Sequence, residues 1–189
     1  MRYLVFFTIL ILATGLKAIG QKSNTANIII PAPKNIEWGV GDFVIDARTK
    51  LVTSNGDTRK IAGFFIQDLK LAANIQLQQV SKAPSTNYIL FRTDKSLKSE
   101  HYQLSINPDR VVVSAADYNG FLYGVQTLKQ LLPPQIFSKT IVSKTAWSVP
   151  AAEIEDGPRF AYRGLMLDLS RHFFFDGLCK TGSRSFGRT

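Results

Sequence analysis

The chain has 189 residues, of which 45% are hydrophobic, and a formal net charge of +9 at pH 7. This length allows one domain and part of a second, the apolar content excludes global disorder, and the single cysteine, Cys179, excludes an internal disulfide and a paired-cysteine metal site. The charge is scattered, with an excess of three in residues 1–22 and two in residues 173–189, so it forms no basic stripe with interleaved aromatics, and we expect no nucleic-acid partner.

Residues 1–20 have the pattern of a secretory signal peptide. Arg2 supplies a cationic start, residues 4–16 are apolar apart from threonine and glycine, and small residues stand before Gln21, where a signal peptidase would cleave. The apolar run is short for a membrane span. We therefore expect export to the periplasm or the extracellular space and no stable membrane span after cleavage. The alternative is an uncleaved N-terminal anchor.

The next part of the chain predicts extended structure. Two prolines keep residues 27–33 away from the centre of a sheet. Residues 36–38 and 42–46 are short apolar stretches separated by a Gly-Val-Gly turn, which predicts a β-hairpin. Residues 51–53 predict another short strand.

A first amphipathic helix is predicted to begin within residues 54–57. Its apolar side chains recur at helical spacing and predict a face packed against a sheet. They are Ile61, Phe65, Leu69 and Ala72, with Phe64 and Leu71 widening the stripe. Strands are predicted at 77–80 and 88–91, with a polar loop between them.

Residues 101–114 predict a second hairpin. Residues 101–106 alternate between apolar and polar side chains, Asn107-Pro108-Asp109 makes the turn, and residues 110–114 return. His101 stands at the start of the first strand, where we expect it to face solvent.

A second helix follows, with Asp117 or Asn119 as its N-cap. Its apolar face consists of Phe121, Val125, Leu128 and Leu132, and Pro133-Pro134 ends it. Gly120 and Gly124 lie one turn apart, which would let the helix approach a sheet closely.

Residues 135–148 predict a connecting loop or hairpin, and residues 149–158 predict a strand and then a turn. This strand carries two carboxylates, Glu153 and Glu155, on one face. Two like charges so placed repel each other, which favours a solvated sheet edge over an acid/base pair.

Residues 159–174 contain a short apolar run, 165–169, with polar and cationic groups at both ends. This pattern predicts a strand buried on both faces, as in a β/α barrel. Arg163 stands where the strand begins, and His172 follows its end. A lone arginine in such a place is usually solvated or salt-bridged. The few possible ligands near His172 are too few for a metal site.

Two stretches resemble family 20 glycoside hydrolases, the β-N-acetylhexosaminidases. The first resembles the opening of their catalytic barrel and consists of Phe160, Arg163-Gly164-Leu165, Leu167-Asp168 and Ser170-Arg171-His172-Phe173. The second, residues 120–132, resembles the last helix of the small α+β domain that precedes that barrel.

The resemblance implies an α+β fold with a small sheet and two helices on one face in residues 21–158. The first strand of an incomplete β/α barrel would follow in residues 159–174. Arg163 would then be the substrate-binding residue, donating hydrogen bonds to hydroxyls of a terminal N-acetylhexosamine. The rigid fork of a guanidinium suits that task. The implied partner is a glycan with terminal GlcNAc or GalNAc, with no cofactor and no metal.

Residues 175–189 depart from the family pattern, because they have no helical period and end in basic and polar residues. We expect them to be a disordered, non-family tail of a truncated product. Family members use substrate-assisted catalysis with an adjacent Asp-Glu pair on a later barrel strand. No such pair occurs here, so we expect no catalytic residue in this chain and no activity of the chain alone. The alternatives are a stand-alone secreted scaffold module and another glycosidase with a similar leading domain.

Overall fold

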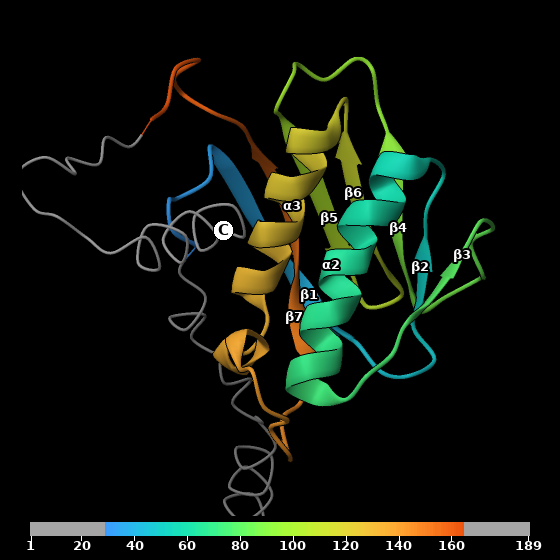
Figure 1. The fold of residues 1–189 in the computed structure, drawn as a ribbon. Helices are drawn as coiled ribbons and strands as arrows, with labels where there is room; N and C mark the ends of the chain where they lie inside the picture. The colour runs from blue at the N-terminus through green and yellow to red at the C-terminus, as the bar shows by residue number, and fades with distance from the viewer. Residues whose placement is uncertain (1–28, 165–189) are drawn as a thin grey trace, which may run out of the picture.

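The computed structural model describes residues 29–164 as one seven-stranded mixed sheet with two helices on one face (Figure 1). The strands are β1 (Asn35–Val44), β2 (Lys50–Val52), β3 (Gln78–Val80), β4 (Tyr88–Thr93), β5 (Tyr102–Asn107), β6 (Arg110–Ala115) and β7 (Ser148–Asp156). The helices are α2 (Gly56–Ala73), α3 (Tyr118–Leu131) and a single 3-10 turn, η1 (Pro134–Phe137). The predicted α+β fold class is confirmed. The expected signal peptide (1–20), apolar strand (165–169) and tail (175–189) lie outside the described residues.

The strand order is β1-β7-β5-β6-β4-β2-β3. The half of the sheet formed by β1, β7, β5 and β6 is antiparallel, whereas β6, β4, β2 and β3 pair in parallel. Parallel neighbours need a crossover connection, and α2 supplies it between β2 and β3. Figure 1 shows α2 and α3 side by side over the same face of the sheet.

The ends of α2 follow from its capping residues. Asn55 accepts a hydrogen bond from the backbone N–H of Thr58 at 2.9 Å, and the hydroxyl of Thr58 accepts one from the backbone N–H of Asn55 at 3.1 Å. This capping box satisfies donors that the first turn leaves unpaired. At the other end Asn74 takes the left-handed conformation, with φ of 55°.

The predicted buried stripe of α2 is confirmed for Ile61, Phe65, Leu69 and Ala72. Its predicted widening is wrong, because Phe64 is 53% exposed and Leu71 is 43% exposed. The sheet contacts only one side of the helix, and both side chains lie outside that side. Two large apolar groups therefore remain on the outer surface.

Helix α3 lies close to the sheet because glycines face it. The N-cap is Asp117, whose carboxylate accepts a hydrogen bond from the backbone N–H of Gly120 at 2.9 Å. A Cβ added at Gly124 would lie 2.7 Å from a methyl carbon of Val113, and one at Gly120 would lie 2.5 Å from the carbonyl oxygen of His101. The predicted close approach is confirmed.

The core lies between the sheet and the helices. Its largest fully buried side chains include Phe43, Phe65, Phe91, Ile89, Leu104 and Leu128. Alternate side chains of β5 face opposite sides of the sheet. Leu104 is fully buried against the helices, whereas Ser105 faces the other side and is half-buried. No helix of the described residues covers that other side, which we call the open face (Figure 1).

The predicted hairpin at 36–46 is wrong. Residues 35–44 form one strand, β1, which pairs with β7 along its length, and the Gly-Val-Gly stretch makes a register shift between Trp38 and Asp42. Gly41 has φ of 91°, a conformation that glycine adopts without strain and that fits a bulge as well as a turn.

The predicted hairpin formed by β5 and β6 is confirmed. The expected sheet edge at β7 is wrong, because β7 pairs with β1 on one side and β5 on the other. The solvation expected there is found, since Glu153 and Glu155 are exposed on the open face. Within residues 29–164, no helix is long and apolar enough to cross a bilayer.

Candidate functional site

Arg163 is bound to the small domain at the point where the chain leaves the sheet. One of its terminal nitrogens, Nη1, donates to the carbonyl oxygen of Phe160 at 2.6 Å. The other, Nη2, donates to the carboxylate of Glu100 at 2.8 Å and to the hydroxyl of Tyr123 at 3.2 Å. Residues far apart in the sequence thus meet at one guanidinium: Glu100 precedes β5 and Tyr123 belongs to α3.

Both carboxylate oxygens of Glu100 have partners. Oε2 accepts from Arg163, and Oε1 accepts from the side-chain amide of Asn119 at 3.1 Å and from the hydroxyl of Tyr123 at 3.3 Å. The hydrogen bond from Arg163 is the largest cause that holds the pKa of Glu100 below its usual value. In turn, Glu100 raises the pKa of Arg163. The pair is therefore ionised at neutral pH.

The backbone under Glu100 is fixed by Asp117. Glu100 has φ of 64°, in the left-handed region that a glutamate rarely adopts. One carboxylate oxygen of Asp117 accepts from the backbone N–H of Glu100 at 2.9 Å and from the hydroxyl of Ser99 at 2.6 Å, while the other caps α3 at Gly120. Burial opposes ionisation of Asp117, but these hydrogen bonds outweigh it and hold its pKa below the usual value.

His101 lies next to this cluster and is half-buried. Its Nδ1 lies 3.0 Å from the carbonyl oxygen of Ser99, and its Nε2 lies 3.1 Å from the ammonium of Lys34. A neutral ring that donates from Nδ1 and accepts at Nε2 satisfies both contacts. A Cβ added at Gly157 would lie 2.4 Å from the ring, so the glycine leaves room for it.

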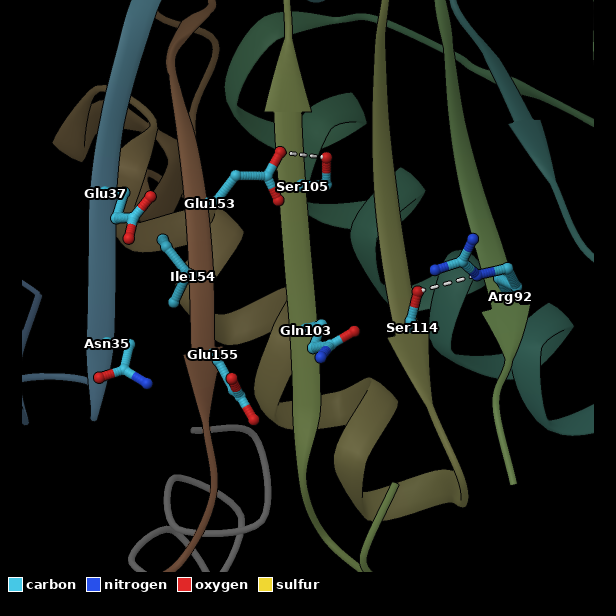
Figure 2. Close-up of a pocket in the computed structure, with 9 residues that line it drawn as sticks. All are labelled: Asn35, Glu37, Arg92, Gln103, Ser105, Ser114, Glu153, Ile154 and Glu155. Atoms are coloured by element: carbon cyan, nitrogen blue, oxygen red, sulfur yellow. Dashed lines mark hydrogen bonds between the residues drawn. The ribbon is translucent and has the colours of Figure 1, made fainter. Parts of the chain in front are cut away.

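The open face carries a groove of about 440 Å³ that crosses several strands (Figure 2). Carboxylates of Glu37, Glu153 and Glu155 project into it from β1 and β7, and Arg92 lies at its other side on β4. Ser105 donates to Glu153 at 2.5 Å. Glu153 and Glu155 are exposed in this groove, in line with their expected solvation.

The outer surface of the helix layer exposes several large apolar side chains among charged ones such as Lys60 and Lys70. The apolar side chains are Phe64 and Leu71 on α2, Phe137 at the end of η1 and Ile141 in the loop that follows. A pocket of about 600 Å³ lies between α2 and residues 139–141, with Leu71 and Ile141 in its wall. We call these four side chains the apolar helix surface.

The loop beside the apolar helix surface is tied down. The backbone N–H of Val142 donates to the carbonyl oxygen of Ala72 at 2.8 Å. Nearby, the buried ammonium of Lys129 pairs with Asp68 at 2.7 Å and lies 5.1 Å from the ring centre of Phe137. The loop that carries Ile141 is therefore held against the end of α2. Among residues 29–164, no His, Cys, Asp or Glu side chains come together in a group of three that could bind a metal.

The sequence predicted Arg163 as a site residue but not its partners. The contact with Glu100 spans 63 residues and the contact with Tyr123 spans 40. No local pattern marks either partner, because the contacts depend on the packing of α3 beside the end of β7. The one available signal was the predicted cap at Asp117, which orders the backbone before β5. Binding of a sugar by Arg163 stays a prediction, which residues 29–164 do not test.

Comparison with protein families gives one match over most of the chain. Residues 26–157 match the family model described as glycosyl hydrolase family 20, domain 2. A β-hexosaminidase of Porphyromonas gingivalis is 33% identical over 184 residues, which covers 92% of this chain and 24% of that protein. A β-hexosaminidase of Vibrio furnissii is 30% identical over 145 residues, or 77% of this chain and 22% of that protein.

Solved structures give the same result. The N-acetyl-β-hexosaminidase of Streptomyces plicatus, in complex with Thio-NAglucal, matches with a TM-score of 0.75 and 30% identity over 86% of this chain and 32% of that chain. The family 20 β-N-acetylhexosaminidase of Streptomyces coelicolor A3(2) matches with a TM-score of 0.73 and 30% identity, over 84% and 32%. This chain thus spans about a quarter to a third of the length of these relatives.

Proposed function

This chain belongs to glycosyl hydrolase family 20, and from that membership we propose that it serves as the non-catalytic small domain of an exported β-N-acetylhexosaminidase. The complete enzyme would remove terminal non-reducing N-acetylhexosamine residues from glycans by substrate-assisted, retaining catalysis. The observation that carries the proposal is the match of residues 26–157 to domain 2 of the family. The relatives named above supply the substrate class.

The apolar helix surface supports a docking role for this domain. Phe64, Leu71, Phe137 and Ile141 are between 43% and 62% exposed, although large apolar side chains gain free energy when another surface covers them. The open face, in contrast, carries charges that are costly to bury. A following catalytic domain would therefore pack against the helices and leave the open face in water.

A stand-alone secreted scaffold module is the second candidate. It is favoured by the closed core of the small domain, since every buried side-chain nitrogen and oxygen among residues 29–164 has a hydrogen-bond partner. A domain whose buried polar groups are all paired within itself needs no partner to satisfy them. The two candidates differ in what the apolar helix surface does: it contacts a catalytic barrel in the first, and it has no barrel to contact in the second.

Two assays test the proposal. The 189-residue chain should not hydrolyse p-nitrophenyl N-acetyl-β-D-glucosaminide, and turnover by the pure chain would overturn its non-catalytic role. In the second assay, residues 26–157 replace the matching domain of the Porphyromonas gingivalis relative. We expect this chimera to hydrolyse the same substrate, and an inactive, well-folded chimera would favour the stand-alone module.

Substitutions in the chimera locate the contact. Phe64→Glu with Leu71→Glu should lower its activity and solubility, because these charges would have to be buried against the barrel. The matched control is Val40→Glu on β1, where the side chain is 94% exposed and away from the helices. The control should keep full activity. Circular dichroism of the isolated small domain checks that neither variant disturbs the fold.

A further inference from the structure

We propose that the open face is a docking surface for a second copy of this chain, and that two copies pair face to face through Glu155 and Arg92. The proposed function does not enter this inference, because a catalytic domain would contact the helices on the opposite side of the sheet. The basis of the pairing is the arrangement of charge and hydrogen-bonding groups on the open face.

The charges in the groove of the open face are divided between its two sides. Three carboxylates, those of Glu37, Glu153 and Glu155, lie on β1 and β7, and Arg92 lies on β4 (Figure 2). The side chains that line the groove from β5 and β6, between these sides, are uncharged. Neighbouring strands are about 4.8 Å apart, so three spacings, about 14 Å, separate β7 from β4. Glu155 and Arg92 of one chain are therefore too far apart to form an ion pair with each other.

Strand register places Glu155 and Arg92 in one row across the sheet. Gln103 on β5 is the partner of Glu155 on one side and of Ser114 on the other, and Ser114 is the partner of Arg92. The row therefore reads Glu155, Gln103, Ser114, Arg92, and its midpoint lies between β5 and β6. The two charged residues stand at opposite ends of this row, one strand beyond each central strand.

Such a row is complementary to itself under a two-fold axis that runs along the strands through the midpoint. The rotation sets Glu155 of each copy opposite Arg92 of the other, so that two ion pairs form, and it sets Gln103 opposite Ser114. Packed sheets lie about 10 Å apart with their strands within about 30° of each other. A glutamate and an arginine that reach from opposite sides span this gap, and charges that are costly to cover alone are paired.

Both charged side chains are available to a partner. Each is exposed, and within residues 29–164 Glu155 has no ion-pair partner. In the same part of the chain, the guanidinium of Arg92 makes one hydrogen bond, from Nε to the hydroxyl of Ser114 at 3.1 Å. That bond orients the fork and leaves both terminal nitrogens for a carboxylate. The groove of about 440 Å³ beside Glu155 gives the arginine of the second copy room to enter.

The expected interface is small. Five strands about 4.8 Å apart, each with about six residues of about 3.3 Å, give a face of roughly 500 Å² per copy, below the roughly 800 Å² per partner of a stable complex. The contacts are polar, and the net charge of +9 makes two copies repel each other. The dimer is therefore weak, with a dissociation constant on the order of 0.1 to 1 mM.

Charge reversal tests the pairing in the 189-residue chain. Dilution of the isotope-labelled chain, followed by NMR, measures the dissociation constant and shows from the amide shifts which surface pairs. Glu155→Arg and Arg92→Glu should each raise the dissociation constant about tenfold, because each turns both ion pairs into repulsive contacts. Labelled Arg92→Glu mixed with unlabelled Glu155→Arg should associate as the wild type does, because the two variants complement each other. The chain that carries both reversals should do the same.

One control separates the pairing from net charge. Lys60→Glu, at an exposed position on α2, lowers the net charge as much as Arg92→Glu does and should not weaken association. A chain that stays monomeric at about 2 mM would overturn the proposal. Association that neither reversal weakens, or a mixture that pairs no better than its components, would overturn it as well. The assay contains no sugar and no catalytic domain, so its failure leaves the proposed function standing, and an inactive chimera would leave the pairing standing.

Discussion

The two faces of the sheet contrast in almost every physical property. The face under the helices buries Leu104, Val111 and Val113 completely, whereas the open face displays Glu153, Glu155 and their polar neighbours to solvent. Both faces come from the same strands and differ only by the alternation of side chains. Stability therefore comes from one face, and the open face adds solubility at little cost. The apolar helix surface lies on the same side of the sheet as the buried core.

The largest test of this contrast uses two neighbours on β5. Leu104→Ala leaves a cavity in the core and should lower the free energy of unfolding by about 3 kcal/mol. Ser105→Ala removes only the hydrogen bond to Glu153 on the open face and should change it by less than about 1 kcal/mol. Urea unfolding of both variants measures the difference. Similar losses would mean that the two faces are not as unequal as described.

A second test concerns the gap between α3 and the sheet. Gly124→Ala places a Cβ within 2.7 Å of Val113 and should cost about 2 kcal/mol, because two rigid elements must separate. The control is Gly63→Ala on α2, where nothing lies within 4 Å. That variant should stabilise the helix by about 0.5 kcal/mol or more. Thermal unfolding of the pair gives opposite shifts, and shifts of the same sign would contradict the close packing.

The smallest test uses pH. Burial under the helices raises the pKa of Tyr102 to about 12, although the hydrogen bond with Thr127 alone would lower this pKa. The unfolded value is about 10, so the neutral ring stabilises the fold fully below pH 10, and this contribution is lost as pH rises towards 12. At pH 11 the loss is about 1.4 kcal/mol.

Tyr102→Phe serves as the control for the pH test, because its ring cannot ionise. Chemical unfolding of both proteins at pH 8 and pH 11 measures their free energies of unfolding. Between these pH values, the free energy of unfolding should decrease more in the wild type than in the variant. Equal decreases would show that the hydroxyl of Tyr102 reaches water in the folded protein.

Sequence patterns predicted the helices and the β5–β6 hairpin because local residues determine them. Asn55, Asp117 and the Pro133-Pro134 pair mark helix ends through short-range contacts. The hairpin at 36–46 failed because a Gly-Val-Gly stretch fits a turn and a bulge equally well, and only the distant partner β7 selects the bulge. The prediction that Phe64 widens the buried stripe is wrong because helical spacing cannot show how much of the helix surface the sheet covers.

The candidate site was predictable only in part for the same reason. Arg163 stood out by its neighbours in the sequence, but its contacts come from α3 and from the loop before β5. The helix surface has a signal in the sequence, since Phe64 and Leu71 are apolar and extend the stripe of α2. The pattern places them in the core because it does not say which side of a helix has a partner.

The pairing of β1 with β7 has a consequence for synthesis on the ribosome. Among residues 29–164, the first strand along the chain, β1, pairs with the last, β7, and the backbone N–H of Lys34 donates to the carboxylate of Asp156 across 122 residues. Until β7 has emerged, the backbone amides and carbonyls of β1 have no partner strand and can pair with wrong segments. The pairing of β1 with β7 then requires contacts between residues far apart in the sequence, and such contacts form slowly. On this physical argument β1 gains its partner strand only after β7 has left the ribosome, and not in an early collapse of the first strands.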